Sequence, residues 1–124
     1  MTGAPIRVGL VGCAALKLPH TATARDLYVS QLFRKASTYA EATCDRWYVL
    51  SAKHGLVHSD AVIEPYDLRL SRSRTSLVNR EWAVTVRDQL AVELNGLEQV
   101  TLIALAGEQY RTALTGVRGR VRFR

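Results

Sequence analysis

LSAKHGLVHSDAVIEPYDLRL, residues 50–70, follows an apolar run that begins at Trp47 and carries most of the chain's strong acid–base side chains. The apolar run predicts a buried strand. The short irregular stretch after it holds Ser51, Lys53, His54, Glu64, Tyr66 and Asp67. In open α/β sheets, ligands bind in the crevice outside the carboxyl ends of the strands. We therefore expect the active or binding cleft at this stretch.

Three apolar runs predict the strands of one parallel sheet. Nearly continuous apolar runs are typical of strands buried on both faces, and here they cover 6–11, 46–52 and 100–106. Segments with helical periodicity alternate with them at 23–43, 77–94 and 108–115, with room for a last strand. This alternation predicts an α/β fold, a three-layer sandwich with a mostly parallel sheet flanked by helices. Right-handed crossovers would place the loops after the three strands along one edge.

The helices are predicted from their ends and from their apolar spacing. The first should begin at Thr23, a good N-cap with Asp26 three positions later. Its residues at helical spacing should face the sheet: Tyr28, Leu32, Ala36, Tyr39 and Ala40. Tyr28 could instead point into the cleft. The stripe of the second helix is Val78, Trp82, Val86, Leu90 and Leu94, and Asn95-Gly96 suits a C-cap.

Glycine and proline set the conformation expected of the irregular stretch. Gly55 should supply a positive φ or a close backbone approach, and residues 53–56 should turn away from the sheet. Pro65 cannot donate a backbone hydrogen bond and biases Glu64 towards an extended form. We therefore expect 64–67 to be a fixed, non-helical segment that aims its side chains.

Length and composition favour a single globular domain over residues 1–124. Apolar residues make up 48% of the 124, which suffices for one core without disulfides. No apolar run approaches the roughly 20 residues of a membrane span. No basic region precedes the first apolar run, so we expect no signal peptide. These features predict a cytoplasmic protein with no membrane partner.

Cysteine and histidine usage leads us to expect no metal and no cofactor. Cys13 and Cys44 make neither a disulfide framework nor a zinc site, and the three histidines lack ligand spacing. Cys13 follows the first strand. It is either a nucleophile or a small apolar thiol packed at the strand end.

A net charge of +6 predicts an anionic partner, a nucleic acid or a nucleotide. The arginines expected to contact phosphate follow the motif or end the chain: Arg69, Arg72, Arg74, Arg118, Arg120, Arg122 and Arg124. If the C-terminal segment is a strand, its alternate arginines share one face. The alternatives are a merely basic protein and a frayed basic tail.

The segments CAALKL, ARDLYVSQLFRKA, YVLSAKHGLV, EPYDLRL, the helix around Trp82 and LAGEQY span nearly the whole chain. In this order they resemble a family of small bacterial and phage proteins, domain of unknown function 6884. LSAKHGL and EPYDL also resemble, more remotely, blocks of the peroxide-stress protein YaaA. Members often carry Ser-Lys where this chain has Ala14 and Ala15, and their ends are glycine-rich rather than arginine-rich.

The resemblance implies an α/β sandwich related to base-excising or base-exchanging glycosidases, and YaaA-type proteins are associated with DNA binding. With the motif, it predicts an N-glycosidase-like enzyme acting on a nucleotide or nucleic-acid base. Asp67 would stabilise the sugar cation or activate water, unless it is a turn or cap residue. Lys53 would act electrostatically and His54 as an acid, unless they form only a structural turn. The other prediction is a non-catalytic nucleic-acid-binding domain for DNA protection or stress response.

The residues expected to line the substrate are Cys13, Lys17, Tyr28, Ser51, Gly55, Glu64, Tyr66, Gly107 and Tyr110. Tyr66 offers a flat face for stacking on a base, and Tyr28 and Tyr110 could provide further stacking faces. The alternative is that these rings only pack in the hydrophobic core. Lys17 lies in a loop between a strand and a helix. It would bind phosphate there or be a solvated lysine.

Overall fold

The structure of the chain is a computed structural model that describes residues 5–71, 76–97, 99–114 and 120–123. Its centre is a five-stranded sheet in the order β4-β3-β1-β6-β7. The parallel strands are β1 (Ile6–Gly12), β3 (Arg46–Ser51), β6 (Val100–Leu105) and β7 (Arg120–Phe123). β4 (Gly55–His58) pairs antiparallel with β3. The expected α/β class and mostly parallel sheet are confirmed.

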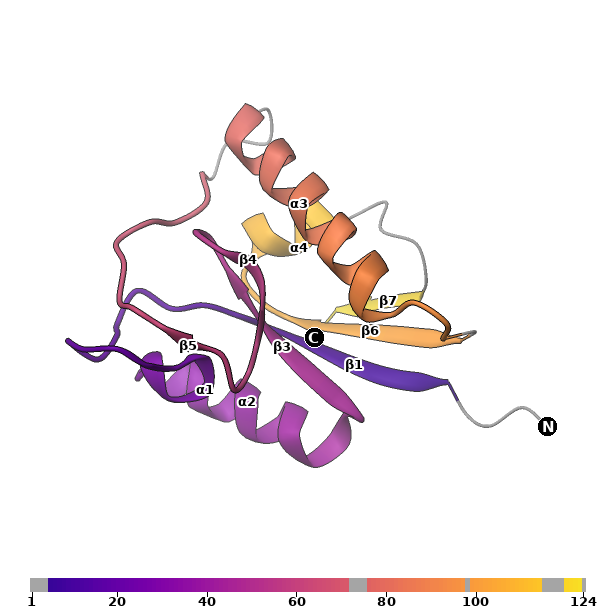
Figure 1. Cartoon of the computed structure of the whole chain (residues 1–124), viewed down its shortest axis with the longest axis horizontal. Helices are drawn as coiled ribbons and strands as arrows, with labels where there is room; N and C mark the ends of the chain where they lie inside the picture. The colour runs from indigo at the N-terminus through magenta and orange to yellow at the C-terminus, as the bar shows by residue number, and fades with distance from the viewer. Residues whose placement is uncertain (1–4, 72–75, 98, 115–119, 124) are drawn as a thin grey trace.

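Helices cover both faces of the sheet (Figure 1). α3 (Leu77–Glu93) and α4 (Glu108–Leu114) lie on one face, and α1 (Ala24–Leu27) and α2 (Gln31–Thr43) lie on the other. Successive side chains of a strand point to opposite faces, so Leu10 of β1 joins the core under α3 and α4 while Val11 joins the core under α1 and α2. The apolar strands of the sequence therefore fill two cores, one on each side.

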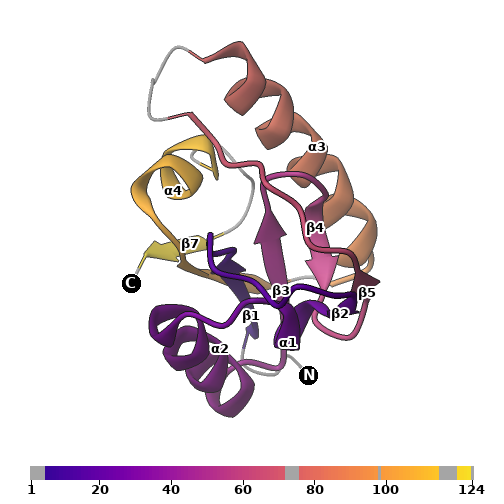
Figure 2. The same ribbon diagram turned by 90° about the vertical axis from the view of Figure 1, so that its left-hand side faces the viewer.

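The carboxyl ends of β1, β3 and β6 meet at one edge of the sheet, which lies to the left in Figure 1 and faces the viewer in Figure 2. From the central strand β1 the chain passes first to β3 on one side and later to β6 on the other. Open α/β sheets bind their ligands at such a switch point. Residues 64–71, which follow β5 (Val62–Ile63), cross this edge in both views.

The expectation of one helix over 23–43 is wrong, because the chain breaks it at Tyr28. Tyr28 has an extended backbone, with φ −90° and ψ 121°, and forms an isolated antiparallel bridge with Lys17. Ser30 then caps α2 by accepting a hydrogen bond from the Phe33 N–H. The break shifts the helical phase. Leu32 is consequently 79% exposed, while Phe33 is buried.

The expectation that residues 53–56 leave the sheet is also wrong. They form a tight hairpin, so that β4 returns alongside β3 and Ser51 pairs with Gly55. Gly55 permits this turn because it adopts a φ of +74°. A Cβ at this position would also collide with the side-chain amide of Gln89 on α3. Both properties expected of Gly55, the positive φ and the close approach, are confirmed.

The second long helix and the third strand are where the sequence predicts them. Trp82, Val86 and Leu90 of α3 are buried as expected, whereas Val78 is 64% exposed in the first turn of the helix, which extends past the sheet in Figure 1. The C-cap of the helix is Leu94, one residue before the expected Asn95-Gly96, and Gly96 follows in the turn with a φ of +85°. None of the described helices is long and apolar enough to cross a membrane.

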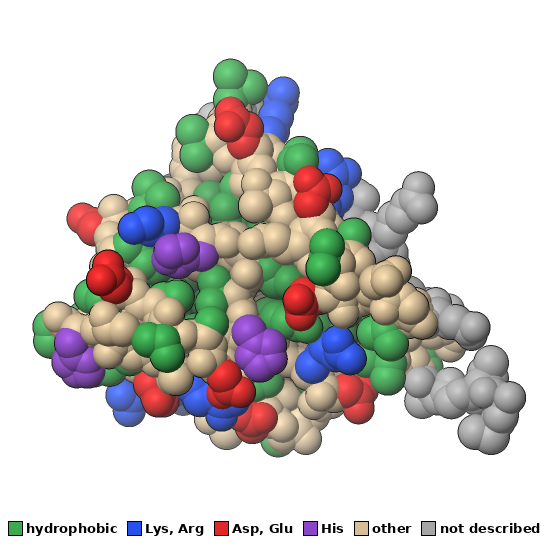
Figure 3. Space-filling view, in the orientation of Figure 1, with side chains coloured by type: hydrophobic (Ala, Val, Ile, Leu, Met, Phe, Trp, Pro, Cys, Tyr) green, Lys and Arg blue, Asp and Glu red, His purple; other side chains and the backbone are tan. Residues whose placement is uncertain are grey.

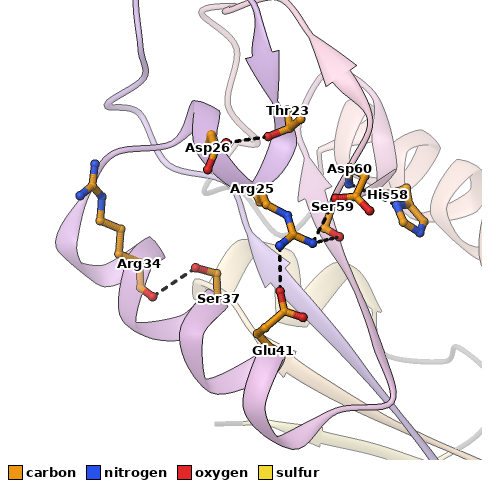
Figure 4. A network of polar contacts seen from close by, with 9 residues as sticks. All are labelled: Thr23, Arg25, Asp26, Arg34, Ser37, Glu41, His58, Ser59 and Asp60. Carbon is orange, nitrogen blue, oxygen red and sulfur yellow. Dashed lines mark hydrogen bonds and ion pairs between the residues drawn. The ribbon is translucent and has the colours of Figure 1, made fainter.

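A polar network anchors the start of the segment that crosses the edge (Figure 4). β2 (Ala22–Thr23) pairs antiparallel with β5, and Arg25 binds Glu41 of α2 at 2.9 Å and Asp60 at 3.1 Å. Thr23 stands before α1 as expected, but its hydroxyl donates to Asp26 instead of capping the helix. Residues 64–67 therefore follow an anchored two-stranded ladder.

Candidate functional site

Three hydroxyl groups meet at the end of β3 and form a chain, Ser51–Tyr66–Tyr28, called the hydroxyl chain below. The Ser51 hydroxyl donates to Tyr66 Oη at 2.8 Å, and the hydroxyl oxygens of Tyr66 and Tyr28 are 2.6 Å apart. Ser51 and Tyr28 are almost completely buried, and Tyr66 is half-buried. Three residues expected to line the substrate, far apart in the sequence, therefore touch one another.

Ser51 also organises the hairpin that follows β3. Its Oγ accepts the backbone N–H of Lys53 at 3.2 Å and that of His54 at 3.0 Å. Its carbonyl oxygen accepts the indole N–H of Trp82 at 2.8 Å, which ties α3 to the end of the strand. The hydroxyl proton of Ser51 is thereby left to point at Tyr66.

Lys17 reaches the hydroxyl chain from the loop after β1. Its backbone bridge to Tyr28 brings the two residues together, and Nζ lies 4.4 Å from the ring centre of Tyr66 and 5.7 Å from that of Tyr28. These are cation–π distances. The ammonium therefore lies over a ring face that the sequence suggested for stacking. Within the described part of the chain, no carboxylate forms an ion pair with Lys17, and its hydrogen bond to the Ala15 carbonyl is long, at 3.4 Å.

Cys13 and Tyr110 form a second contact beside the hydroxyl chain. Cys13 Sγ is half-buried and lies 3.2 Å from Tyr110 Oη. The Tyr110 ring packs edge-on against Trp82, with centroids 5.4 Å apart. The ends of β1 and β6 approach each other closely here. A Cβ added to Gly12 would lie only 2.9 Å from the Cβ of Ala106. The two strands that flank the switch point therefore bring a thiol and a phenol together.

Burial keeps the tyrosines of the site neutral. It raises the pKa of Tyr28 to about 12, and it raises the pKa values of Tyr66 and Tyr110 above the ordinary value of 10.0 as well. The pKa of His54 is lowered, first by desolvation and then by the charge of Lys53. At neutral pH the site therefore offers phenolic O–H groups and a neutral imidazole.

The residues expected to be catalytic lie at the surface around the hydroxyl chain. Lys53, His54 and Asp67 are exposed, and so are Glu64 and Gly107. The His54 ring meets the Tyr66 ring edge-on, with centroids 5.7 Å apart. No described residue donates a hydrogen bond to the Asp67 carboxylate, so no turn or cap role for it is visible among these residues.

The arginines expected to bind phosphate are only partly described. Arg69 is exposed, and Arg120 and Arg122 belong to β7, the expected last strand, which pairs with β6. Outside the described residues lie Arg72, Arg74, Arg118 and Arg124. On the face seen in Figure 3, acidic and basic side chains are interspersed. Among the described residues, no three His, Cys, Asp or Glu side chains gather in a way that could hold a metal ion.

Gln89 of α3 supports the site and was not expected from the sequence. Its Oε1 accepts the Leu56 N–H at 2.7 Å, and its Nε2 donates to the His54 carbonyl at 3.1 Å. One amide thus holds both sides of the Gly55 turn. A signal was present, because Gln89 lies three positions after Val86 and seven after Trp82, on the stripe that faces the sheet. A polar residue on such a stripe requires a partner.

These features define an α/β protein whose parallel strands end at a cluster of neutral hydroxyls, a thiol and an ammonium group. Within that class, the chain belongs to a family of unknown function, DUF6884, whose model matches residues 8–122, and the expected family is confirmed. The chain is similar to the uncharacterized protein YfjM of Bacillus subtilis (strain 168), with 29% identity over 98 residues. The match covers 77% of this chain and spans 62% of the length of that relative.

Proposed function

We propose that the protein is an N-glycosidase-like enzyme acting on a nucleotide or a nucleic-acid base, built as a three-layer α/β sandwich and remotely related to YaaA. The observation that carries this proposal is the meeting of the hydroxyl chain with Lys17 and Cys13 beside the exposed Asp67. Polar groups from separate loops converge there on the switch point, where α/β sheets bind ligands. A nucleotide substrate would place the activity in the cytoplasm.

Cleavage of an N-glycosidic bond builds positive charge on the sugar and negative charge on the departing base. The Asp67 carboxylate would stabilise the sugar cation or take a proton from the attacking water. Its exposure, and the absence of a donor to it among the described residues, leave it available for this task. Lys53, two residues after Ser51 and exposed, would place positive charge near the departing base.

His54 would supply the proton that the departing base needs. Because its pKa is lowered, the imidazolium is a minor form at pH 7, and it is a stronger acid when it forms. The contact of its ring with Tyr66 places it beside the hydroxyl chain. This role links base release to pH.

The test of the proposal is direct detection of free base. The folded protein is incubated with nucleosides, nucleoside 5′-monophosphates, RNA and DNA carrying modified bases, and the products are analysed by mass spectrometry. We expect free base from at least one of these substrates and none from the same preparation of the Asp67→Asn variant, which controls for contaminating enzymes. A folded wild-type protein that releases no base from any of them contradicts the proposal.

A second candidate is a non-catalytic nucleic-acid-binding domain acting in DNA protection or stress response. The net charge of +6 favours this function, because it attracts an anionic nucleic acid. The hydroxyl chain also favours it, because no described carboxylate takes part in its hydrogen bonds. This function predicts salt-sensitive binding with no chemical change in the ligand. Replacing Arg118, Arg120, Arg122 and Arg124 with Gln would then reduce the slope of log affinity against log salt by about 0.9 for each phosphate of duplex DNA that these arginines neutralise.

A further inference from the structure

The three hydroxyl groups of the hydroxyl chain carry three protons, but only two hydrogen bonds join them to one another. Ser51, Tyr66 and Tyr28 carry one hydroxyl proton each while the tyrosines stay neutral. The Ser51 proton lies in the bond to Tyr66, and a second proton lies in the 2.6 Å bond between the tyrosines. The third, on Tyr28 or on Tyr66, has no acceptor with hydrogen-bond geometry among the described residues.

Ser51 is a poor acceptor for this third proton, and its contact with Tyr28 lowers the pKa of that phenol, as a donating hydroxyl does. Its two lone pairs already accept the N–H groups of Lys53 and His54. A buried O–H without an acceptor costs free energy, and Tyr28 is only 1% exposed, so its hydroxyl donates to Tyr66 and the remaining proton lies on Tyr66, which is only half-buried. The chain is therefore built to donate one further hydrogen bond, from the cluster to an atom outside it.

The charge around this donor is positive. Lys17 is half-buried, its Nζ lies over the Tyr66 ring, and no described carboxylate forms an ion pair with it. The phenols beside it are neutral, so no phenolate balances the ammonium. A half-buried cation beside a phenol donor matches an acceptor that carries negative charge.

We propose that Tyr28, Tyr66 and Lys17 form a subsite for an anionic oxygen of the ligand, and that this oxygen belongs to a phosphate monoester. The subsite rests on the proposed function for the identity of the rest of the ligand, and it makes a nucleoside monophosphate the substrate class. The phenolic proton is donated to one phosphate oxygen, and the Lys17 ammonium neutralises its charge. Tyr66 then acts through its hydroxyl and not as a stacking platform.

The test compares ligands that differ only in the phosphate. Affinities of the full chain for nucleoside 5′-monophosphates, the matching nucleosides, inorganic phosphate and acetate are measured by calorimetry at low salt. We expect each monophosphate that binds to do so at least about tenfold more tightly than its nucleoside, as charge-assisted hydrogen bonds allow. Inorganic phosphate should compete with the monophosphate and acetate should not. Competition by acetate at equal concentration would assign the subsite to a carboxylate ligand and overturn the phosphate proposal.

Matched variants identify the groups responsible. Tyr28→Phe, Tyr66→Phe and Lys17→Met should each weaken monophosphate binding about tenfold or more while leaving nucleoside binding unchanged. Tyr48→Phe is the control, because the Tyr48 hydroxyl donates to Glu93 at 2.9 Å on the α3 side, away from the hydroxyl chain. Its affinities should equal those of the wild type.

Two outcomes separate this subsite from the proposed function. Phosphate-dependent binding that is abolished in the three variants, without any base release, contradicts the glycosidase and leaves the subsite standing. Base release with equal affinity for nucleosides and monophosphates, or with variants that bind like Tyr48→Phe, overturns the subsite. A wild-type protein that binds neither monophosphates nor inorganic phosphate at millimolar concentration overturns it as well.

Discussion

Tyr66 and Asp67 are neighbours in the chain and lie in different environments. The hydroxyl of Tyr66 is bonded to Ser51 and Tyr28 inside the protein, and burial raises its pKa. Asp67 is exposed, and no described residue donates a hydrogen bond to it. One side chain is therefore fixed and neutral, and the other is free to meet a ligand. The difference separates a buried half of the site, where changes should cost stability and binding, from an exposed half, where they should cost catalysis alone.

The largest effect should come from the exposed half. Asp67→Asn removes the charge that would stabilise the sugar cation, and base release should fall at least about a hundredfold. The thermal midpoint should stay at the wild-type value, because Asp67 is exposed. Activity is measured by base release and stability by scanning calorimetry. Glu64→Gln, a matched change in the same exposed segment, should lower activity far less, and a collapse of stability in Asp67→Asn would show that Asp67 is structural.

Gly55 belongs to the fixed half of the comparison, although Lys53 and His54 before it are exposed. Gly55→Ala would strain a backbone with φ +74° and push a Cβ into the Gln89 amide, which holds both sides of the turn. We expect a loss of about 2–4 kcal/mol in the free energy of unfolding, measured with urea. Gly96→Ala is the control, because φ is +85° there but nothing lies within 4 Å of the added Cβ. It should cost about 1 kcal/mol, and equal losses in the two variants would mean that Gln89 gives way freely.

The buried phenol of Tyr28 should make the protein sensitive to alkaline pH. Its pKa is about 12 in the folded chain and about 10 in the unfolded chain. Below pH 10 both states are protonated and the stability is fully present. Between pH 10 and 12 the unfolded state loses its proton first, so stability should fall by about 2–3 kcal/mol from this group. Urea unfolding of the wild type and of Tyr28→Phe at pH 9 to 12 measures it, and identical pH dependence in the two proteins would contradict the prediction.

Sequence patterns located the central parallel strands β1, β3 and β6 and their carboxyl edge, because apolar runs record burial directly. They failed where a contact between distant segments overrides the local pattern. The break at Tyr28 arises from its bridge with Lys17, and the return of β4 depends on the Gln89 amide reaching across from α3. Helical spacing cannot report either contact. The contacts of Tyr66 with Lys17 and Ser51 also join segments that are distant in the sequence, and its stacking on a base stays a prediction.

His54 lies between the two halves, exposed but with its ring against Tyr66. Desolvation and the charge of Lys53 lower its pKa, so the imidazolium becomes more populated as the pH falls below neutrality. If His54 protonates the departing base, the rate of base release should increase about tenfold for each unit by which the pH falls from 8 towards the His54 pKa. The pH–rate profile measures it. His54→Gln should lose this dependence, and a variant that keeps it would assign the proton to another group.

The smallest effect should come from Arg25, which anchors the segment before Tyr66 and Asp67. Its side chain is 38% exposed, and its partners Glu41 and Asp60 are 56% and 67% exposed. Ion pairs this open to water contribute about 0–1 kcal/mol and weaken with salt, so Arg25→Gln should lower stability by about 0.5 kcal/mol at low salt and by less at high salt. Urea unfolding at two salt concentrations measures both values.

Base release should not change in Arg25→Gln, because backbone hydrogen bonds hold the same segment without the side chain. The N–H of Ala24 donates to the Ala61 carbonyl at 2.8 Å, and that of Arg25 donates to the Ser59 carbonyl at 3.0 Å. These bonds persist when the guanidinium is removed. A large loss of activity at nearly wild-type stability would mean that the ion pairs, and not the backbone ladder, set the position of Asp67 relative to the hydroxyl chain.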